Sequence, residues 1–203
     1  MIKAIVFDFG NVICYFYNSL FLKNISVYTN KTVAELDDLI YRRSNLPIQY
    51  ETGLITSDQF FEKITTLCNL SINKVDFRKA FTTIYTPIPS TFKLIKKLKM
   101  RYKLGLLSNV SEWQFDYGIK RISIFKLFDA VSTSFQVGAM KPNRKIFYDI
   151  LDKLKLTPEK CVYIDDTEEF VKVAQQIGFH VIKYQSHELL LKSLIDEDLD
   201  VKN

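Results

Sequence analysis

The chain has 203 residues, of which 47% are hydrophobic and 14% aromatic, and this is enough apolar surface for a folded domain with a buried core. No window approaches the roughly 18 to 20 uninterrupted apolar residues of a membrane span, and the N-terminus lacks a signal-peptide pattern, so we expect a cytoplasmic protein with no membrane partner. The net charge is +5, but the main lysine cluster, residues 93–103, interleaves with a helical apolar face, so we expect no nucleic-acid partner.

The first predicted element is a strand over residues 4–7, which ends in a carboxylate, Asp8. Ala-Ile-Val-Phe is a run typical of a buried parallel strand, and the Gly10-Asn11 pair that follows indicates a turn. An acid at this point of the chain is either a turn residue or a reactive group.

The next segment, residues 15–87, has a helical pattern. We predict helices at about 17–29, 32–43 and 57–68, the last opened by a capping box between Thr56 and Gln59. A helical domain is therefore expected as an insertion after the first strand. It divides the chain into a core domain of residues 1–14 and 88–203 and an all-helical cap of residues 15–87.

After residue 87, strand and helix patterns alternate. Predicted strands cover 103–107, 129–134, 161–164 and 180–184. The helices between them have apolar faces, and we place their boundaries at Ser90, Pro142, Thr167 and Gly178. This alternation predicts an α/β fold, a Rossmann-like parallel sheet with helices on both faces.

The three cysteines, Cys14, Cys68 and Cys161, are an odd number with no pair at metal-ligand spacing. This argues against a disulfide framework and against a zinc site. We interpret all three as reduced residues of the core.

Polar side chains follow the ends of the predicted strands. They are Asp8, Ser108 with Asn109, Lys141, and Asp165 with Asp166. Because ligands of open α/β sheets bind beyond the carboxyl ends of the strands, we expect these groups to meet in one crevice. The carboxylates suit Mg²⁺, whereas the hydroxyl, amide and ammonium groups suit the oxygens of a phosphate.

Four segments carry a family resemblance: VFDFGNV, LLSN, GAMKPNRKIF and VYIDDTEEFVKVAQQIG. In this order and spacing they resemble the motifs of the haloacid dehalogenase-like superfamily of phosphohydrolases. The inserted segment resembles the cap of its helical-cap phosphatases. Its stretch YETGLITSDQFF (50–61) is similar to a subgroup that includes sugar-1-phosphate phosphatases and the phosphatase domain of soluble epoxide hydrolases.

The resemblance implies a role for each strand-end residue. Asp8 would be the nucleophile and form an aspartyl-phosphate intermediate. Ser108, Asn109 and Lys141 would hold the phosphoryl oxygens, and Lys141 would also neutralise the nucleophile. Mg²⁺ would be bound by Asp8 and Asp166, with the Gly10 carbonyl as a further ligand and Asp165 either in the metal shell or bonded to Lys141.

One position departs from the family pattern, because Gly10 stands where most members have a second Asp that protonates the leaving oxygen. General acid catalysis is worth about 10² to 10⁴ in rate, so its loss matters least for a leaving group that departs easily. We therefore favour an activated substrate such as a sugar 1-phosphate.

Substrate selection is expected to reside in the cap. Tyr15, Phe16, Tyr17 and Tyr50 are candidates to cover the leaving group, and Glu51 is a candidate to bond a sugar hydroxyl or to supply the missing proton. The alternative is that these aromatic residues pack the core of the cap itself.

Three functions are compatible with these residues. The first is a Mg²⁺-dependent phosphatase acting on a small phosphorylated metabolite, as a monomer or a homodimer. The second is a phosphate-binding or regulatory protein that turns over little because of Gly10. The third is a haloacid dehalogenase, against which Asp165 and Asp166 argue, because halide displacement needs no Mg²⁺.

Overall fold

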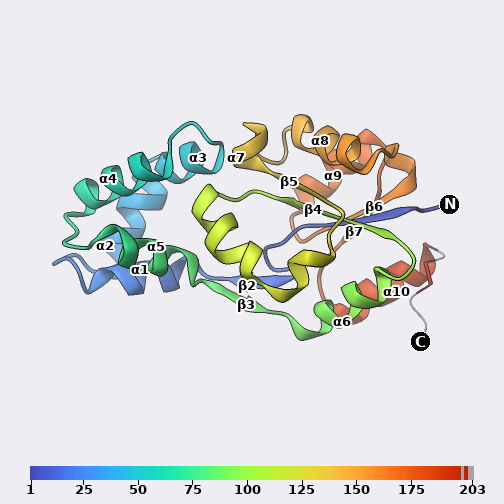
Figure 1. Ribbon diagram of the computed structural model, residues 1–203, viewed down its shortest axis with the longest axis horizontal. Helices are drawn as coiled ribbons and strands as arrows, with labels where there is room; N and C mark the ends of the chain where they lie inside the picture. The colour runs from blue at the N-terminus through green and yellow to red at the C-terminus, as the bar shows by residue number, and fades with distance from the viewer. Residues whose placement is uncertain (198, 201–203) are drawn as a thin grey trace.

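The fold is built on a parallel sheet that runs through the core domain (Figure 1). A computed structural model describes residues 1–197, 199 and 200. Five strands form the sheet in the order β5-β4-β1-β6-β7, and all pairs are parallel. Their bounds are Ala4–Phe7 for β1, Lys103–Ser108 for β4, Ala130–Thr133 for β5, Cys161–Asp165 for β6 and His180–Lys183 for β7.

The central strands are buried on both faces because their sequences are continuous apolar runs. All residues of β1 are buried, and Phe7, its last residue, lies in register with Leu106 of β4 and Ile164 of β6. The residues that follow these strands therefore emerge at one edge of the sheet. The predicted Rossmann-like sheet is confirmed.

Helices cover both faces of the sheet (Figure 1). One face packs against α6 (Pro89–Leu98) and α10 (His187–Asp196), and the other against α8 (Arg144–Leu154) and α9 (Glu168–Ile177). The predicted apolar face of α8 is buried throughout: Ile146, Phe147, Ile150, Leu151 and Leu154. Shorter segments join these elements: η2 (Gln114–Gly118), η3 (Ile119–Arg121), η4 (Ser123–Leu127), α7 (Ser134–Val137) and η5 (Pro158–Lys160).

Two of the four predicted boundaries in this domain are displaced, those at Ser90 and Pro142. Helix α6 begins at Pro89, so Ser90 lies inside it, and Ile88 is the N-cap residue. Asn143, not Pro142, precedes α8, and its side chain accepts a hydrogen bond from the Lys145 amide. Thr167 does hold the N-cap position of α9, but its side chain makes no capping bond. Gly178 ends α9 in the left-handed conformation, as predicted.

The inserted segment is helical and joins the core domain through a short antiparallel ribbon. The ribbon pairs β2 (Cys14–Phe16) with β3 (Tyr85–Pro87). Between them lie α1 (Asn18–Ser26), α2 (Val33–Asp37), the π-helical η1 (Asp38–Arg43), α3 (Leu46–Glu51), α4 (Ser57–Cys68) and α5 (Lys74–Thr82). The predicted capping box of Thr56 and Gln59 is present. We propose residues 15–87 as the cap, and the position of the ribbon at its two ends supports this division.

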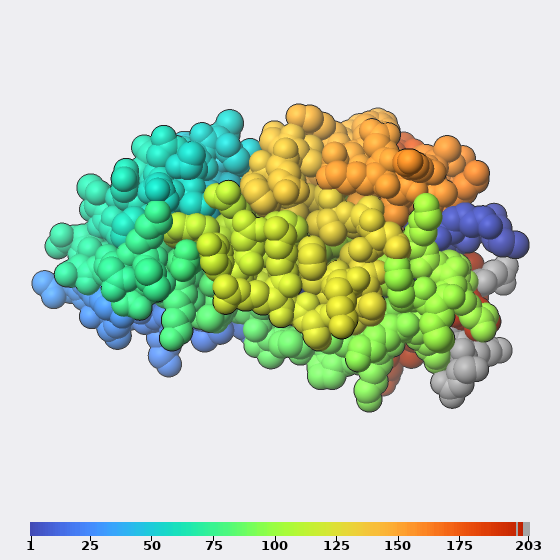
Figure 2. Space-filling model, in the orientation of Figure 1, coloured from blue at the N-terminus to red at the C-terminus, as the bar shows by residue number. Residues whose placement is uncertain are grey.

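The cap has a hydrophobic core of its own, rich in aromatic rings. Tyr50 stacks on Phe60 at a centroid distance of 4.4 Å, and Phe21 meets the edge of Phe81 at 5.0 Å. Trp113, which follows β4, is also part of this cluster and lies 6.4 Å from the Tyr50 ring. The core domain therefore contributes a side chain to the core of the cap, and the space-filling view shows the two in continuous contact (Figure 2).

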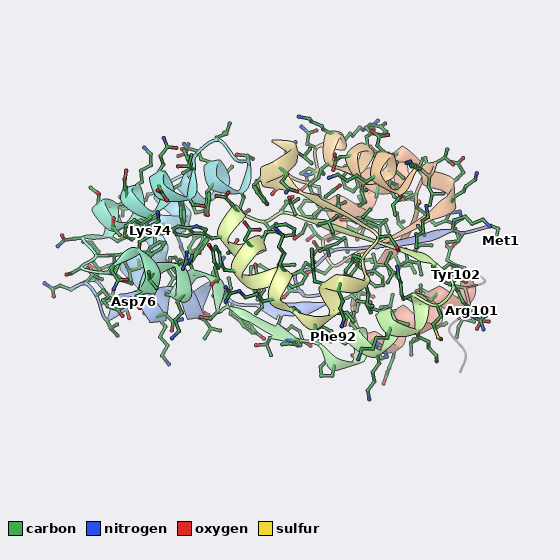
Figure 3. The ribbon with its side chains drawn as sticks, in the orientation of Figure 1. Met1, Lys74, Asp76, Phe92, Arg101 and Tyr102 are labelled. Atoms are coloured by element: carbon green, nitrogen blue, oxygen red, sulfur yellow. The ribbon has the colours of Figure 1, made fainter. Side chains whose placement is uncertain are left out.

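The carboxyl ends of the strands face the cap. Strand β1 runs from the N-terminal end of the molecule towards it (Figure 1). Met1, Arg101 and Tyr102 lie at the far end of the core domain, whereas Lys74 and Asp76 of α5 mark the opposite end of the molecule (Figure 3). The edge where ligands of such sheets bind is therefore the edge that the cap approaches.

Two other expectations can be compared with the structure. Cys14, Cys68 and Cys161 are free and buried, as predicted. Among the helices of the described residues, none is long and apolar enough to cross a membrane.

Candidate functional site

The strand-end residues meet at a cavity between the sheet and the cap. The cavity has a volume of about 300 Å³, and Asp8, Ser108, Asn109, Lys141 and Asp166 all border it. Asp8 and Asp165 lie side by side at the ends of the neighbouring strands β1 and β6. The Asp8 amide donates to the carbonyl of Ile164, the residue before Asp165, at 2.9 Å. The expected convergence of these residues is therefore present in the structure.

Lys141 joins two carboxylates at the centre of the site. Its Nζ atom donates to Asp8 Oδ1 at 2.6 Å and to Asp165 Oδ2 at 2.7 Å. The Lys141 side chain is only 2% exposed, and that of Asp165 is fully buried. Burial by itself would lower the pKa of Lys141, but the charges of Asp8 and Asp165 raise it above its ordinary value, so the lysine is held as a cation.

Asp8 is a buried acid whose negative charge is only partly balanced, because Lys141 is also paired with Asp165. Burial raises the pKa of its carboxyl, Lys141 opposes this shift, and the nearby Asp165 adds to it. One lysine is therefore shared by two carboxylates. A further cation at Asp8 would stabilise the ionised form that a nucleophile requires.

Asp165 is fixed by three hydrogen bonds, one of them from Lys141. Its Oδ2 atom accepts from Lys141 and from the hydroxyl of Tyr163, and its Oδ1 atom accepts from the Thr167 amide at 2.8 Å. This last bond satisfies the amide of Thr167, the N-cap residue of α9.

The site has the donor set of a divalent-cation site. Asp8, Asp165 and Asp166 each offer a carboxylate oxygen, and these atoms lie within 4.8 Å of one another. Among the described residues, Lys141 is the one cation paired to them, and with all three carboxylates ionised the group has a net charge of −2. Asn11 donates from Nδ2 to Asp166 Oδ2 at 3.1 Å and holds that carboxylate in place. Hard oxygen ligands and this charge fit Mg²⁺.

Asn109 clamps the backbone of Lys141. Its Oδ1 atom accepts from the Lys141 amide at 2.7 Å, and its Nδ2 atom donates to the Lys141 carbonyl at 3.1 Å. Ser108, which borders the cavity beside it, makes only a long bond of 3.4 Å to the Asn109 carbonyl. The Ser108 hydroxyl is therefore available to an anion, while Asn109 also fixes the lysine loop.

Gly10 leaves one side of Asp8 without a polar side chain. A Cβ atom at this position would lie 3.0 Å from Phe16 Cε1 and 3.8 Å from Asp8 Oδ2. The ring of Phe16, from strand β2, therefore occupies the space that a side chain of residue 10 would need.

The cap residues fall into two groups. Glu51 and Phe16 border the cavity. Tyr50 was expected at the leaving group, but it is 2% exposed and packs in the core of the cap, because its ring stacks on Phe60. Tyr15 and Tyr17 are exposed neighbours with rings 6.4 Å apart, and the structure does not place them among the residues that line the cavity.

Several residues of the site were not predicted. They are Asn11 as a partner of Asp166, Tyr163 and Thr167 as partners of Asp165, and Tyr85, Gln114 and Phe170 in the cavity wall. Tyr163 had a usable signal, since it lies two residues before Asp165 and side chains at this spacing share one face of a strand. The wall residues come from distant segments, and no local pattern identifies them.

Comparison with known proteins assigns the chain to a family. Residues 5–184 match the family model of haloacid dehalogenase-like hydrolases. The chain is 23% identical over 192 residues to D-ribitol-5-phosphate phosphatase of Bacteroides thetaiotaomicron, covering 90% of this chain and 92% of that protein. It is 26% identical over 206 residues to glyceraldehyde 3-phosphate phosphatase of Methanocaldococcus jannaschii, covering 90% and 85%.

A solved structure shares the fold. It is a HAD family enzyme from Bacteroides thetaiotaomicron in complex with magnesium and inorganic phosphate, with a TM-score of 0.79, 22% identity, and coverage of 91% of this chain and 95% of that one. The family model spans most of the chain and includes Asp8, Ser108, Lys141 and Asp166. The chain therefore belongs to the haloacid dehalogenase-like hydrolase family.

Proposed function

We propose that this protein is a Mg²⁺-dependent phosphatase that acts on a small phosphorylated metabolite through an aspartyl-phosphate intermediate on Asp8. The coarser part of this statement, a hydrolase of phosphate esters, is supported by family membership and by two relatives that are phosphatases. The finer part, the metal and the intermediate, rests on the geometry of the cavity.

One observation carries the proposal: Lys141 bonds Asp8 and Asp165 at the ends of adjacent strands. A buried carboxylate held by a fixed ammonium group is a suitable nucleophile for phosphorus. The same ammonium group can meet the charge that develops on the phosphoryl oxygens during transfer. We assign Ser108 and Asn109 to the same oxygens.

The reaction then has two steps on this chain. Asp8 attacks phosphorus, the bond to the leaving oxygen breaks, and an aspartyl phosphate forms. Water then attacks the phosphorus and releases Asp8 and phosphate. We assign Mg²⁺ to Asp8, Asp166 and the Gly10 carbonyl, with Asp165 behind Lys141; when bound, it offsets the repulsion between the anionic nucleophile and the anionic phosphate.

The substrate class follows from how the leaving oxygen is stabilised. Without a side chain at Gly10, either the leaving group departs easily, as from a sugar 1-phosphate, or another residue of the cavity protonates it. We propose a phosphorylated sugar or a similar small metabolite as the substrate. Comparing 1-phosphates with 6-phosphates separates the two arrangements.

The test is hydrolysis of a panel of phosphorylated metabolites and p-nitrophenyl phosphate, with Mg²⁺ and with EDTA. Wild type is compared with Asp8→Asn and with a control, Asp152→Asn, which removes an exposed carboxylate on α8. We expect turnover that needs Mg²⁺, is abolished by Asp8→Asn and is unchanged in the control. Mass spectrometry of the acid-quenched enzyme should locate the phosphoryl group on Asp8.

Other outcomes would point to the alternatives. Mg²⁺ binding without turnover of any phosphate would favour the phosphate-binding or regulatory protein. Metal-independent release of halide from a 2-haloacid would favour the dehalogenase. That reaction needs no metal ion, so it does not require the carboxylate cluster of Asp8, Asp165 and Asp166.

A further inference from the structure

Glu51 is a half-buried acid at the cavity that the proposed mechanism leaves unused. It is the last residue of α3 and borders the cavity together with Asp8, Lys141 and Asp166. Within residues 1–197, 199 and 200, its side chain forms no hydrogen bond and no ion pair. A half-buried carboxyl without a protein partner is costly as an anion, and burial raises its pKa to about 7.

The other titratable groups that border the cavity are either engaged or unsuitable as proton donors. In the described part of the chain these groups are Asp8, Tyr85, Lys141 and Asp166. Lys141 is held as a cation by two carboxylates, and Asp8 and Asp166 belong to the acidic cluster. Burial raises the pKa of Tyr85, so its phenol is a weaker acid than usual. Glu51 is the remaining acid that can exchange a proton near neutral pH.

On the side of Asp8 that faces Gly10, the described residues offer no proton donor. Gly10 has no side chain, and the ring of Phe16 lies 3.0 Å from where its Cβ would be. The β2–β3 ribbon therefore presents an apolar ring carbon on this side of the nucleophile. A proton for the leaving oxygen has to come from elsewhere on the cavity wall, and Glu51 on the cap faces the same space.

We propose that Glu51 is the catalytic acid that protonates the leaving oxygen, an inference that rests on the proposed phosphatase function. As Asp8 bonds to phosphorus and the bond between phosphorus and the leaving oxygen breaks, that oxygen takes the proton of the Glu51 carboxyl and departs as an alcohol. Glu51 is then a carboxylate. It takes a proton from the attacking water as the bond between Asp8 and phosphorus breaks, which restores the acid and releases phosphate.

The assignment has a consequence for the substrate. With a proton donor on the cap, the leaving group need not be an activated one, and ordinary alkyl phosphates become substrates. Because the donor sits on α3 and the nucleophile follows β1, both are at the cavity only while cap and core domain are in contact.

The test uses the dependence of rate on the leaving group. The value of kcat/KM, which covers the steps up to release of the alcohol, is measured with p-nitrophenyl phosphate and with glycerol phosphate. The p-nitrophenolate leaves without a proton, whereas the glycerol alkoxide requires one. The variants are Glu51→Gln and the control Glu62→Gln, which changes an exposed glutamate on α4.

We expect Glu51→Gln to lower kcat/KM for glycerol phosphate by about 10² to 10⁴ and to change that for p-nitrophenyl phosphate by less than about threefold. Retained p-nitrophenyl phosphate hydrolysis also shows that the variant is folded. The fall in kcat/KM for glycerol phosphate above pH 7 should be absent in the variant. Two tyrosines act electrostatically on Glu51, Tyr85 from the cavity wall and Tyr41 from outside the cavity. Both stay protonated in this pH range because burial raises both pKa values.

Equal losses on both substrates, or none on either, would overturn the assignment. A higher KM for glycerol phosphate with unchanged kcat would make Glu51 a substrate contact and would also overturn it. These results differ from a failure of the proposed function, in which wild type would hydrolyse neither substrate or Asp8→Asn would remain active.

Discussion

The hydroxyl of Tyr50, in the cap, accepts a hydrogen bond of 3.1 Å from the backbone amide of Trp113, in the core domain. The Ser57 hydroxyl donates to the Glu112 carboxylate, so the Tyr50 hydroxyl in turn donates to Ser57 at 2.6 Å. This chain of hydrogen bonds crosses from one domain to the other and is largely buried. The cap is therefore attached to the core domain by more than the ribbon of β2 and β3.

Removing the Tyr50 hydroxyl should destabilise the protein. Tyr50→Phe keeps the ring stack on Phe60 but leaves the buried Trp113 amide without its acceptor, which costs about 1 to 3 kcal/mol. Urea denaturation at pH 7 measures the change. Tyr15→Phe, at an exposed position, is the control and should change the unfolding free energy by less than about 0.5 kcal/mol. An unfolding free energy unchanged in Tyr50→Phe would show that the Trp113 amide finds another acceptor.

Removing the central cation should be more damaging. Lys141→Met leaves Asp8 and Asp165 facing each other in a buried site without a cation, and breaking a buried ion pair in this way costs about 3 to 5 kcal/mol. Denaturation in the presence of EDTA isolates the effect of the lysine from that of a metal. Lys172→Met, which breaks an exposed pair with Glu168, should cost less than about 1 kcal/mol. Equal effects of the two substitutions would argue against the buried pair as a structural element.

Stability should depend on pH through Glu51. Its pKa is 4.5 in the solvent-exposed, unfolded chain and about 7 in the folded protein, so between these values the folded protein binds more protons than the unfolded chain. The unfolding free energy contributed by this group therefore falls as pH rises from 4.5 to 7 and is constant above.

Glu51→Gln removes that dependence. The variant should gain about 2 to 3 kcal/mol relative to wild type between pH 5 and pH 8, measured by urea denaturation at each pH. Because the other titrating groups are common to both proteins, the difference isolates Glu51. Glu62→Gln should show no such trend. A difference that does not vary with pH would mean that the folded protein solvates the carboxylate well.

The strand ends were predictable because they depend on local sequence alone. Apolar runs identify β1, β4 and β6, and the first polar residue after a parallel strand must emerge at the shared edge. This reasoning identifies Asp8 and Ser108, which border the cavity, and Asp165, which is buried beside it and paired with Lys141. The same reasoning does not say which partner each finds, so Tyr163 beneath Asp165 and the Asn109 clamp on Lys141 emerge only from the structure.

The cap was less predictable because its contacts are not local. Strands β2 and β3 have three residues each and pair across about 70 residues of sequence, so neither has a pattern of its own. Helix α3 is also short, with six residues and Pro47 in its first turn. Tyr50 is an aromatic residue with a polar hydroxyl, the type expected of a substrate contact. Instead, Trp113 from the core domain packs against it, and both belong to a buried cluster.

The contact between Gly10 and Phe16 leads to the last prediction. The φ angle of Gly10 does not lie in the left-handed region, so alanine can adopt its backbone conformation, and Gly→Ala at such a site stabilises by about 0.4 to 1 kcal/mol through the unfolded state. A Cβ 3.0 Å from Phe16 Cε1 opposes this gain, because the ring has to shift. Gly10→Ala should therefore destabilise wild type by about 1 kcal/mol and stabilise the Phe16→Ala variant. A double-mutant cycle of unfolding free energies measures this coupling, and additive effects would show that the ring yields freely and does not exclude a side chain from residue 10.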